Sequence, residues 1–275
     1  MPRTDEIREY AGLRLAVTTF TIVPLRPGAL DRRTAGRAIA WGPAVGAALA
    51  AVASVGIVGM RYVEPLSGAQ RLLPISVGIA LLALFTRGLH LDGLADTADA
   101  LGVQDRGRAL DVMKEPAIGT FGVLALLFVV LVQVTGLTAA DVAQHGTRAL
   151  VLAVATGRIA IAFACVRGVP AARPGGLGAL VAGTLPRAVP VLWSVAAVVA
   201  GAGWAYFDDR GRAPQALIQA GAIVVALAVA LVVQGRLVRR FGGVTGDVLG
   251  ALSELATTVA LALAAANPDI QWFQR

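Results

Sequence analysis

The sequence has few charged residues. Asp, Glu, Lys and Arg make up 15% of its 275 residues, whereas an average soluble domain carries roughly a quarter. It has a single cysteine, Cys165, which excludes an intrachain disulfide and leaves the redox compartment open. The first fourteen residues, MPRTDEIREYAGLR, contain no apolar core followed by small residues, so we expect no cleavable signal peptide. The scarcity of charge argues against an ordinary soluble domain.

Long apolar runs take the place of charge. Hydrophobic residues make up 57% of the chain, and the mean hydropathy is +0.73. Runs of about 20 apolar residues can span a bilayer, and such runs lie at 41–59, 117–137, 149–166, 188–206, 215–234 and 248–266, with a weaker run at 72–86. We predict an all-α polytopic membrane bundle of about seven transmembrane helices, forming a single domain over 1–275. The less favoured alternative is a soluble all-α protein with very apolar buried helices.

The basic residues alternate between the predicted loops. One set of segments (26–37, 87–117, 167–187 and 235–240) is rich in Arg and Lys, and the intervening segments carry fewer, among them Arg61, Arg71, Arg210, Arg212 and Arg275. Because cytoplasmic loops carry the excess of positive charge, this pattern predicts a cytoplasmic N-terminus and an external C-terminus. Segment 1–37 is then cytoplasmic or interfacial, with 13–25 too short to cross the membrane. The net charge of +7 reflects topology, and we expect no nucleic-acid partner.

Three carboxylates stand close together in residues 88–102, GLHLDGLADTADALG. On a helix, Asp92, Asp96 and Asp99 lie within roughly 60° of one another. Like charges beside lipid persist when a cation neutralises them, and Mg²⁺ prefers oxygen ligands of this kind. The bland alternative is a solvated helix end. We therefore treat 87–117 as a cytoplasmic acidic-motif segment that could hold a metal.

A second polar stretch, RFGGVTGDVLGALSE at 240–254, opens the last apolar run. Asp247 and Glu254 are seven residues apart on one helix face, and Glu254 falls inside the predicted span, where ionisable groups are functional candidates. Gly242, Gly243 and Gly246 precede this helix, and their backbone amides could meet an anion. Arg158 is a further charge in mid-span that needs a carboxylate or a phosphate as partner.

Carboxylate clusters, glycine turns and arginines at one membrane face suit phosphoryl transfer with a metal clamp. An ion-coupled transporter is the alternative from another class, but its carboxylates should lie near the midplane in two repeated halves. The predicted clusters lie at one interface, and the sequence shows no repeat. These features favour an enzyme.

Three motifs identify a family resemblance. GLHLDGLADTADALG, DRGRALDVMKEPAIGTFGVLAL (105–126) and GGVTGDVLGALSE occur in this order and resemble the marker motifs of the cobalamin synthase family, adenosylcobinamide-GDP ribazoletransferase. The resemblance implies a Mg²⁺-dependent, multi-pass enzyme of the bacterial cytoplasmic (inner) membrane, with its active site facing the cytoplasm. It would join adenosylcobinamide-GDP to α-ribazole or its 5′-phosphate and release GMP. Its partners would be these small molecules and the bilayer, and the sequence leaves a homo-oligomer open.

Matching the motifs position by position gives the predicted site. We predict a metal site at Asp92, Asp96 and Asp247, catalytic roles for Asp99, Glu254 and His90, and substrate-binding roles for Lys114, Arg158, Gly243 and Thr245. Which carboxylate holds metal and which accepts a proton stays open, and for His90 a hydrogen-bonded structural role is an equal alternative.

The sequence also departs from the family motifs. The family's TGG before LHLDG is TRG here, which introduces Arg87, the closing Gly of the first motif is Ala100, and KDS becomes Lys114, Glu115 and Pro116. A CDP-alcohol phosphotransferase-like lipid enzyme would do related chemistry, but its Ala-Arg pair after Asp-Gly is absent at Asp92-Gly93.

Overall fold

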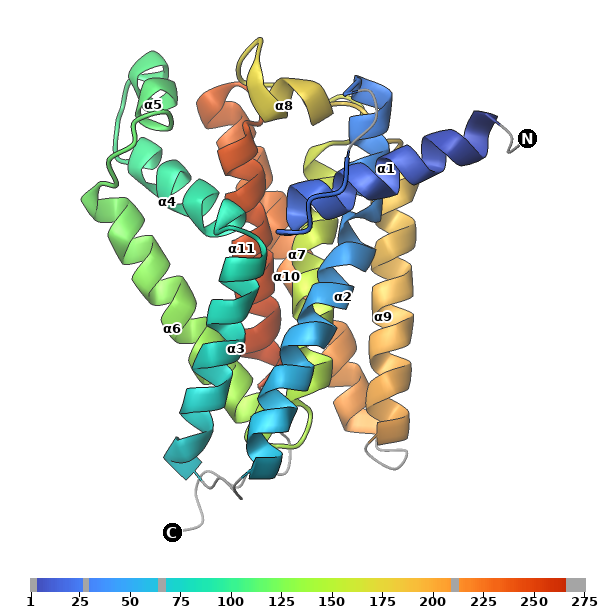
Figure 1. Ribbon diagram of the computed structural model, residues 1–275. Coiled ribbons are helices and arrows are strands. Elements are labelled where there is room, and N and C mark those ends of the chain that lie inside the picture. The colour runs from blue at the N-terminus through green and yellow to red at the C-terminus, as the bar shows by residue number, and fades with distance from the viewer. Residues whose placement is uncertain (1–3, 27–29, 64–67, 209–212, 266–275) are drawn as a thin grey trace.

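The computed structural model describes residues 4–26, 30–63, 68–208 and 213–265, which fold into α-helices and contain no β-strand (Figure 1). Within these residues, six helices are long and apolar enough to cross a membrane: α2 (Arg32–Val63), α6 (Thr120–Val142), α7 (Gly146–Ala164), α9 (Ala188–Asp208), α10 (Ala213–Phe241) and α11 (Gly246–Ala264). The short helix η1 (Gly68–Arg71) leads into α3 (Leu72–Phe85), which with α4 (Leu89–Leu101) makes a seventh candidate, bent by 86°. The remaining helices are α1 (Thr4–Phe20), α5 (Arg106–Val112) and α8 (Gly176–Val181). The predicted all-α membrane bundle is confirmed.

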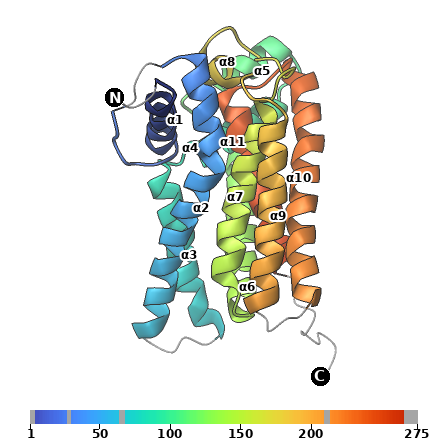
Figure 2. The same cartoon turned by 90° about the vertical axis from the view of Figure 1, so that its right-hand side faces the viewer.

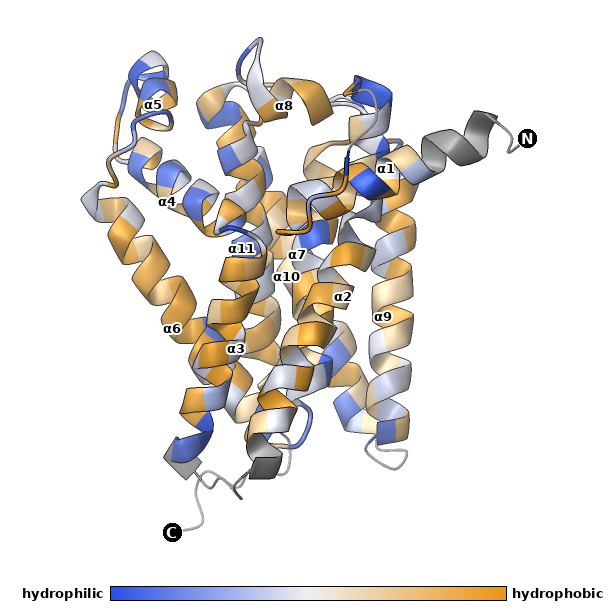
Figure 3. Ribbon diagram, viewed as in Figure 1, coloured by the Kyte–Doolittle hydropathy of each residue, from blue (hydrophilic) through white to orange (hydrophobic). Residues whose placement is uncertain are grey.

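The bundle is built around α7 and α11, which are mostly buried. Their sequences are rich in small residues, and this lets their backbones approach closely. At Gly157 of α7, a Cβ would lie 2.6 Å from the carbonyl oxygen of Ser253 in α11. In contrast, α6 and α9 expose large apolar side chains along most of their length, such as Phe128 and Leu192. Figure 3 shows α6 as predominantly hydrophobic. An exposed apolar belt of this extent marks a lipid-facing surface.

Four shorter helices gather at one end of the bundle. In Figures 1 and 2, α1, α4, α5 and α8 lie at the end where α2, α6 and α11 begin. The described parts of the Arg- and Lys-rich segments 26–37, 87–117, 167–187 and 235–240 therefore share one end, as the charge pattern predicts. Arg210, Arg212 and Arg275, counted above for the opposite end, lie outside the described residues.

Helix α1 lies across the polar end and does not span. It includes much of the 13–25 segment that we predicted to be too short to cross. The Arg87 guanidinium donates a hydrogen bond to the carbonyl oxygen of Thr18 at 3.0 Å. This bond ties the C-terminal end of α1 to the corner between α3 and α4.

The weaker apolar run at 72–86 forms α3, whose 14 residues reach about 21 Å, less than the roughly 30 Å hydrocarbon core. The chain then turns through Arg87 and Gly88, which have φ angles of 56° and 67°. This corner directs α4 across the end of the bundle, where it packs against α11 and α6.

Candidate functional site

Two glycines bring the acidic motifs together where α4 crosses α11. A Cβ on Gly93 would lie 2.7 Å from the carbonyl oxygen of Asp247, and a Cβ on Gly250 would lie 2.9 Å from that of His90. These separations are too short for any residue with a side chain, so the two backbones touch only because both positions are glycine. Residues about 150 positions apart thereby become neighbours, as the two acidic stretches require if they form one site.

A cleft of about 700 Å³ opens beside this crossing. Asp92 and Asp96 of α4 and Asp247 of α11 line it. The Asp96 carboxyl is half-buried and is repelled by the nearby negative charges of Asp92 and Asp247. The cleft therefore contains a cluster of carboxylates whose mutual repulsion a bound cation would offset.

Positive side chains stand on the rim of the same cleft. Lys114 and Arg87 both line it. The Lys114 ammonium is mostly exposed and lies 2.9 Å from Asp111, one turn earlier. This exposed ion pair is weak, so Lys114 is free to reorient toward a phosphate in the cleft.

The carboxylates suit a hard cation such as Mg²⁺, provided that a substrate supplies further ligands. Among the described residues, no three His, Cys, Asp or Glu side chains are close enough together to hold a metal by themselves. Mg²⁺ is commonly bound through one or two carboxylates plus water and substrate phosphates. Asp92, Asp96 and Asp247 fit that arrangement better than a closed protein cage.

The structure places Asp99 apart from the cleft wall. Its two carboxylate oxygens accept hydrogen bonds from the backbone N–H groups of Gly119, at 2.7 Å, and Gly122, at 2.8 Å. Gly119 is the N-cap of α6, and a carboxylate there satisfies amides that have no partner within the helix. Asp99 thus joins the first motif to the IGTFG motif, a role that its helical spacing did not reveal.

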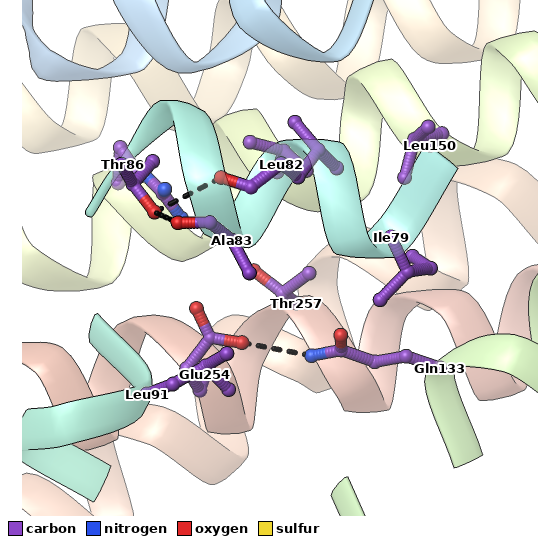
Figure 4. Close-up of a pocket in the computed structure, with 11 residues that line it drawn as sticks. Ile79, Leu82, Ala83, Thr86, Leu91, Gln133, Leu150, Glu254 and Thr257 are labelled. Atoms are coloured by element: carbon purple, nitrogen blue, oxygen red, sulfur yellow. Dashed lines mark hydrogen bonds between the residues drawn. The ribbon is translucent and has the colours of Figure 1, made fainter. Parts of the chain in front are cut away.

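Glu254 points into the bundle interior, toward α6 and the α3–α4 corner (Figure 4). Its carboxylate accepts a hydrogen bond of 2.8 Å from the Gln133 amide, and both side chains are buried. Together with Arg158 and Thr257, they line a separate cavity of about 40 Å³. Leu91 borders both this cavity and the cleft, so the two are adjacent.

Arg158 and His90 are also interior. The Arg158 guanidinium donates to the Ser253 hydroxyl at 2.9 Å and lies 3.3 Å from Nδ1 of His90. The His90 ring stacks on Phe20 of α1, with ring centroids 5.8 Å apart. Neither residue lines the cleft. Arg158 of α7 contacts both Ser253 of α11 and His90 at the start of α4, so it links the three helices.

The predicted glycine loop is held by another segment of the chain. Val244 donates its N–H to the Pro170 carbonyl oxygen at 2.9 Å, and Ala172 donates to Val244 at 3.0 Å. A Cβ on Gly243 would lie 2.5 Å from the Pro170 oxygen, so this glycine is required for loop packing. Thr245 is the N-cap of α11 and accepts from the Val248 N–H. The structure thus gives both predicted binding residues a part in shaping the loop.

Sequence reasoning missed Arg173, whose Nη2 lies 3.4 Å from the Asp247 carboxylate. It stands in the basic segment 167–187, directly before Pro174 and two glycines. That local signal was available, but nothing in the sequence connects it with Asp247. Gln133, the partner of Glu254, was missed for the same reason.

Comparison with known proteins agrees with the motifs. A family model described as cobalamin-5-phosphate synthase matches residues 12–265 of this chain. The adenosylcobinamide-GDP ribazoletransferase of Frankia casuarinae is 46% identical over 268 residues, covering 93% of this chain and 95% of that protein. Proteins of the same name from Nocardioides sp. and Stutzerimonas stutzeri are 38% and 36% identical, over 90% and 91% of this chain and 95% and 97% of their own lengths. No solved structure matches significantly. Its motifs, its membrane bundle and these relatives show that the chain belongs to the cobalamin-5-phosphate synthase family.

Proposed function

We propose that this protein is an adenosylcobinamide-GDP ribazoletransferase, which joins adenosylcobinamide-GDP to α-ribazole or its 5′-phosphate and releases GMP. The observation that carries the proposal is the shared cleft at the α4–α11 crossing. The first and last family motifs each contribute carboxylates to it, and Lys114 from the middle motif stands on its rim. A membrane bundle that lacked this cleft would resemble the family only in its hydrophobic profile.

The chemistry is a displacement at phosphorus. A ribose hydroxyl oxygen of the acceptor bonds to the phosphorus that carries cobinamide, and the bond from this phosphorus to the bridging oxygen breaks, so that GMP leaves. Catalysis of such a reaction rests mainly on positioning and on compensation of the phosphate charge. Bound Mg²⁺ would supply charge neutralisation on the diphosphate.

Each residue of the cleft has a proposed task. Asp92, Asp96 and Asp247 would hold Mg²⁺ together with phosphate oxygens of the substrate, and a carboxylate of this cluster takes the proton of the attacking hydroxyl. Lys114 binds a phosphate oxygen. The interior residues Glu254, Arg158 and His90 act as positioning residues, because none of them lines the cleft and their partners lie on neighbouring helices. Arg158 of α7 meets His90 of α4, and Glu254 of α11 accepts a hydrogen bond from Gln133 of α6.

We also propose that the cleft faces the cytoplasm of a bacterial inner membrane. The described segments rich in Arg and Lys lie at the end of the bundle that contains the cleft, and cytoplasmic loops carry this excess. Both substrates would then meet at the inner membrane surface.

The test is GMP release by the purified protein with adenosylcobinamide-GDP, α-ribazole and Mg²⁺. We expect Asp96→Asn, which keeps the side-chain volume and removes the charge, to lower kcat/KM by at least about a hundredfold, and EDTA to abolish the activity. Asp31→Asn is the matched control, since Asp31 is exposed and caps α2 through the Thr34 N–H, a task that Asn also performs. Full activity of folded Asp96→Asn protein would refute the assigned cluster, and absence of GMP release by the unaltered protein would refute the function.

A further inference from the structure

A smaller pocket of about 140 Å³ adjoins the carboxylate cleft. It is lined by four glycines of segments 175–178 and 244–246, together with Arg173, Thr245 and Asp247. Asp247 lines both the pocket and the cleft. A group bound in the small pocket would therefore lie directly beside the carboxylate cluster.

The pocket wall is largely backbone and is fixed before any ligand arrives. A Cβ on Gly178 would lie 2.6 Å from the Val244 carbonyl oxygen, so segment 175–178 packs tightly against the loop that begins α11. At Gly175 and Gly176, in contrast, a Cβ would meet no atom within 4 Å. These two glycines leave open space, which gives a ligand access to the backbone. A rigid, preformed wall of this kind lowers the entropy lost when a ligand binds.

Arg173 reaches this pocket with most of its hydrogen-bonding capacity unused. Its Nη2 makes two long contacts, each of 3.4 Å, to the Met113 sulfur and to the Asp247 carboxylate. Its Nε is buried and has no hydrogen-bond partner among the described residues. A guanidinium carries five N–H donors, and a buried donor left unsatisfied costs about 1–3 kcal/mol. A ligand whose polar atoms are hydrogen-bond acceptors would satisfy these N–H donors.

Phosphate oxygens match that requirement. They accept hydrogen bonds without donating, and Arg binds them with two parallel N–H groups. A pocket of about 140 Å³ has room for a phosphate group, while pockets for drug-sized ligands occupy about 300–1,000 Å³. The positive charge of Arg173 also offsets the repulsion that Asp247 would exert on such a group.

We propose that Arg173 and the glycine-lined pocket bind a phosphate group of a substrate and fix it beside Asp247. This inference rests on the proposed function and adds a binding residue to it. The phosphate has two sources in that reaction: the diphosphate of the donor, or the 5′-phosphate of a phosphorylated acceptor.

Steady-state kinetics of Arg173→Gln distinguish the sources. If the acceptor phosphate occupies the pocket, KM rises about tenfold or more for α-ribazole 5′-phosphate and stays unchanged for α-ribazole. If the donor phosphate occupies it, KM for adenosylcobinamide-GDP rises by a similar factor with either acceptor. Arg173→Lys, which keeps the charge and loses the paired N–H geometry, should recover part of the loss. Arg167→Gln is the matched control, since Arg167 is an exposed arginine in the same segment.

A structural role for Arg173 predicts a different result. Arg173→Gln would then lower the midpoint of thermal unfolding, with all KM values unchanged, and that outcome would overturn the proposal. Calorimetric titration of the purified protein with inorganic phosphate gives a readout that needs no turnover. Binding that is lost in Arg173→Gln and kept in Arg167→Gln supports the pocket even if GMP release fails. Equal phosphate binding by both variants, in a protein that does release GMP, overturns the pocket alone.

Discussion

One added methyl group at the α4–α11 crossing should disable the site while the bundle still folds. In Gly93→Ala, the new Cβ would lie 2.7 Å from the carbonyl oxygen of Asp247 and 2.9 Å from its Cα. Both atoms belong to the backbone of α11, so neither can rotate aside as a side chain would. Ordinary van der Waals contact begins at 3.4 Å, so the helices must separate by about 0.7 Å.

A separation of this size displaces Asp92 and Asp96 from Asp247. Metal–ligand distances tolerate only about 0.2 Å, and a misplacement of about 1 Å can cost on the order of a hundredfold in rate. We expect kcat for GMP release to fall by about 30- to 100-fold. Overpacking costs about 1–3 kcal/mol of stability, so the midpoint of thermal unfolding should fall by only a few degrees for each kcal/mol.

The assay compares GMP release at saturating substrate with thermal unfolding in the same detergent. Gly221→Ala is the matched control, because it makes the same exchange inside α10 at a position where a Cβ would meet no atom within 4 Å. It should keep the wild-type kcat, and its stability should be unchanged or higher, since Ala favours a helix more than Gly does. A Gly93→Ala protein with kcat within about threefold of the wild-type value would refute the claim that this crossing sets the carboxylate geometry.

Three further predictions test the surroundings of the site. Because Arg87 has a φ of 56°, Arg87→Gly should be about 1 kcal/mol more stable than Arg87→Ala, and equal thermal midpoints would contradict the strained corner. Glu254→Gln keeps an acceptor for Gln133, so we expect its kcat to stay within about tenfold of the wild-type value. Glu254→Ala leaves a buried donor unmatched and should lower the free energy of unfolding by about 1–3 kcal/mol in a denaturation experiment. A hundredfold loss of kcat in a stable Glu254→Gln protein would instead assign Glu254 to the chemistry. A cysteine at the exposed position Gly107 should react with a membrane-impermeant thiol reagent only when the cytoplasmic face of the membrane is accessible to the reagent. The buried Cys165 should not be labelled. Labelling at position 107 from outside intact cells would show that the cleft faces the opposite side.

The local sequence was sufficient to predict the helices and the end of the bundle that carries the site. Apolar runs of spanning length have few stable alternatives to a helix in lipid, because every backbone polar group must be satisfied within the segment. The alternating Arg and Lys content likewise predicted which loops share an end. The i, i+4, i+7 spacing of Asp92, Asp96 and Asp99 correctly indicated a polar helix face.

Only the tertiary structure decided what each member of that face meets. Asp92 and Asp96 line the cleft, whereas Asp99, on the same helix, bonds the backbone at the start of α6. Helical periodicity fixes angles within one helix, but the rotation and crossing of neighbouring helices choose the partners. The corner at Arg87 and Gly88, which turns α4 by 86° from α3, was equally invisible in the apolar pattern.

The same distinction explains the residues that were misplaced or missed. Glu254 was predicted to belong with Asp247 because the two share a helix face, yet it lies in a separate interior cavity with Gln133. Arg173 reaches Asp247 across 74 positions of sequence, a contact that no local spacing encodes. Sequence thus determined which segments are helical and which end is polar, and packing at glycine contacts decided which side chains meet, because approach distances between backbones exist only in the folded bundle.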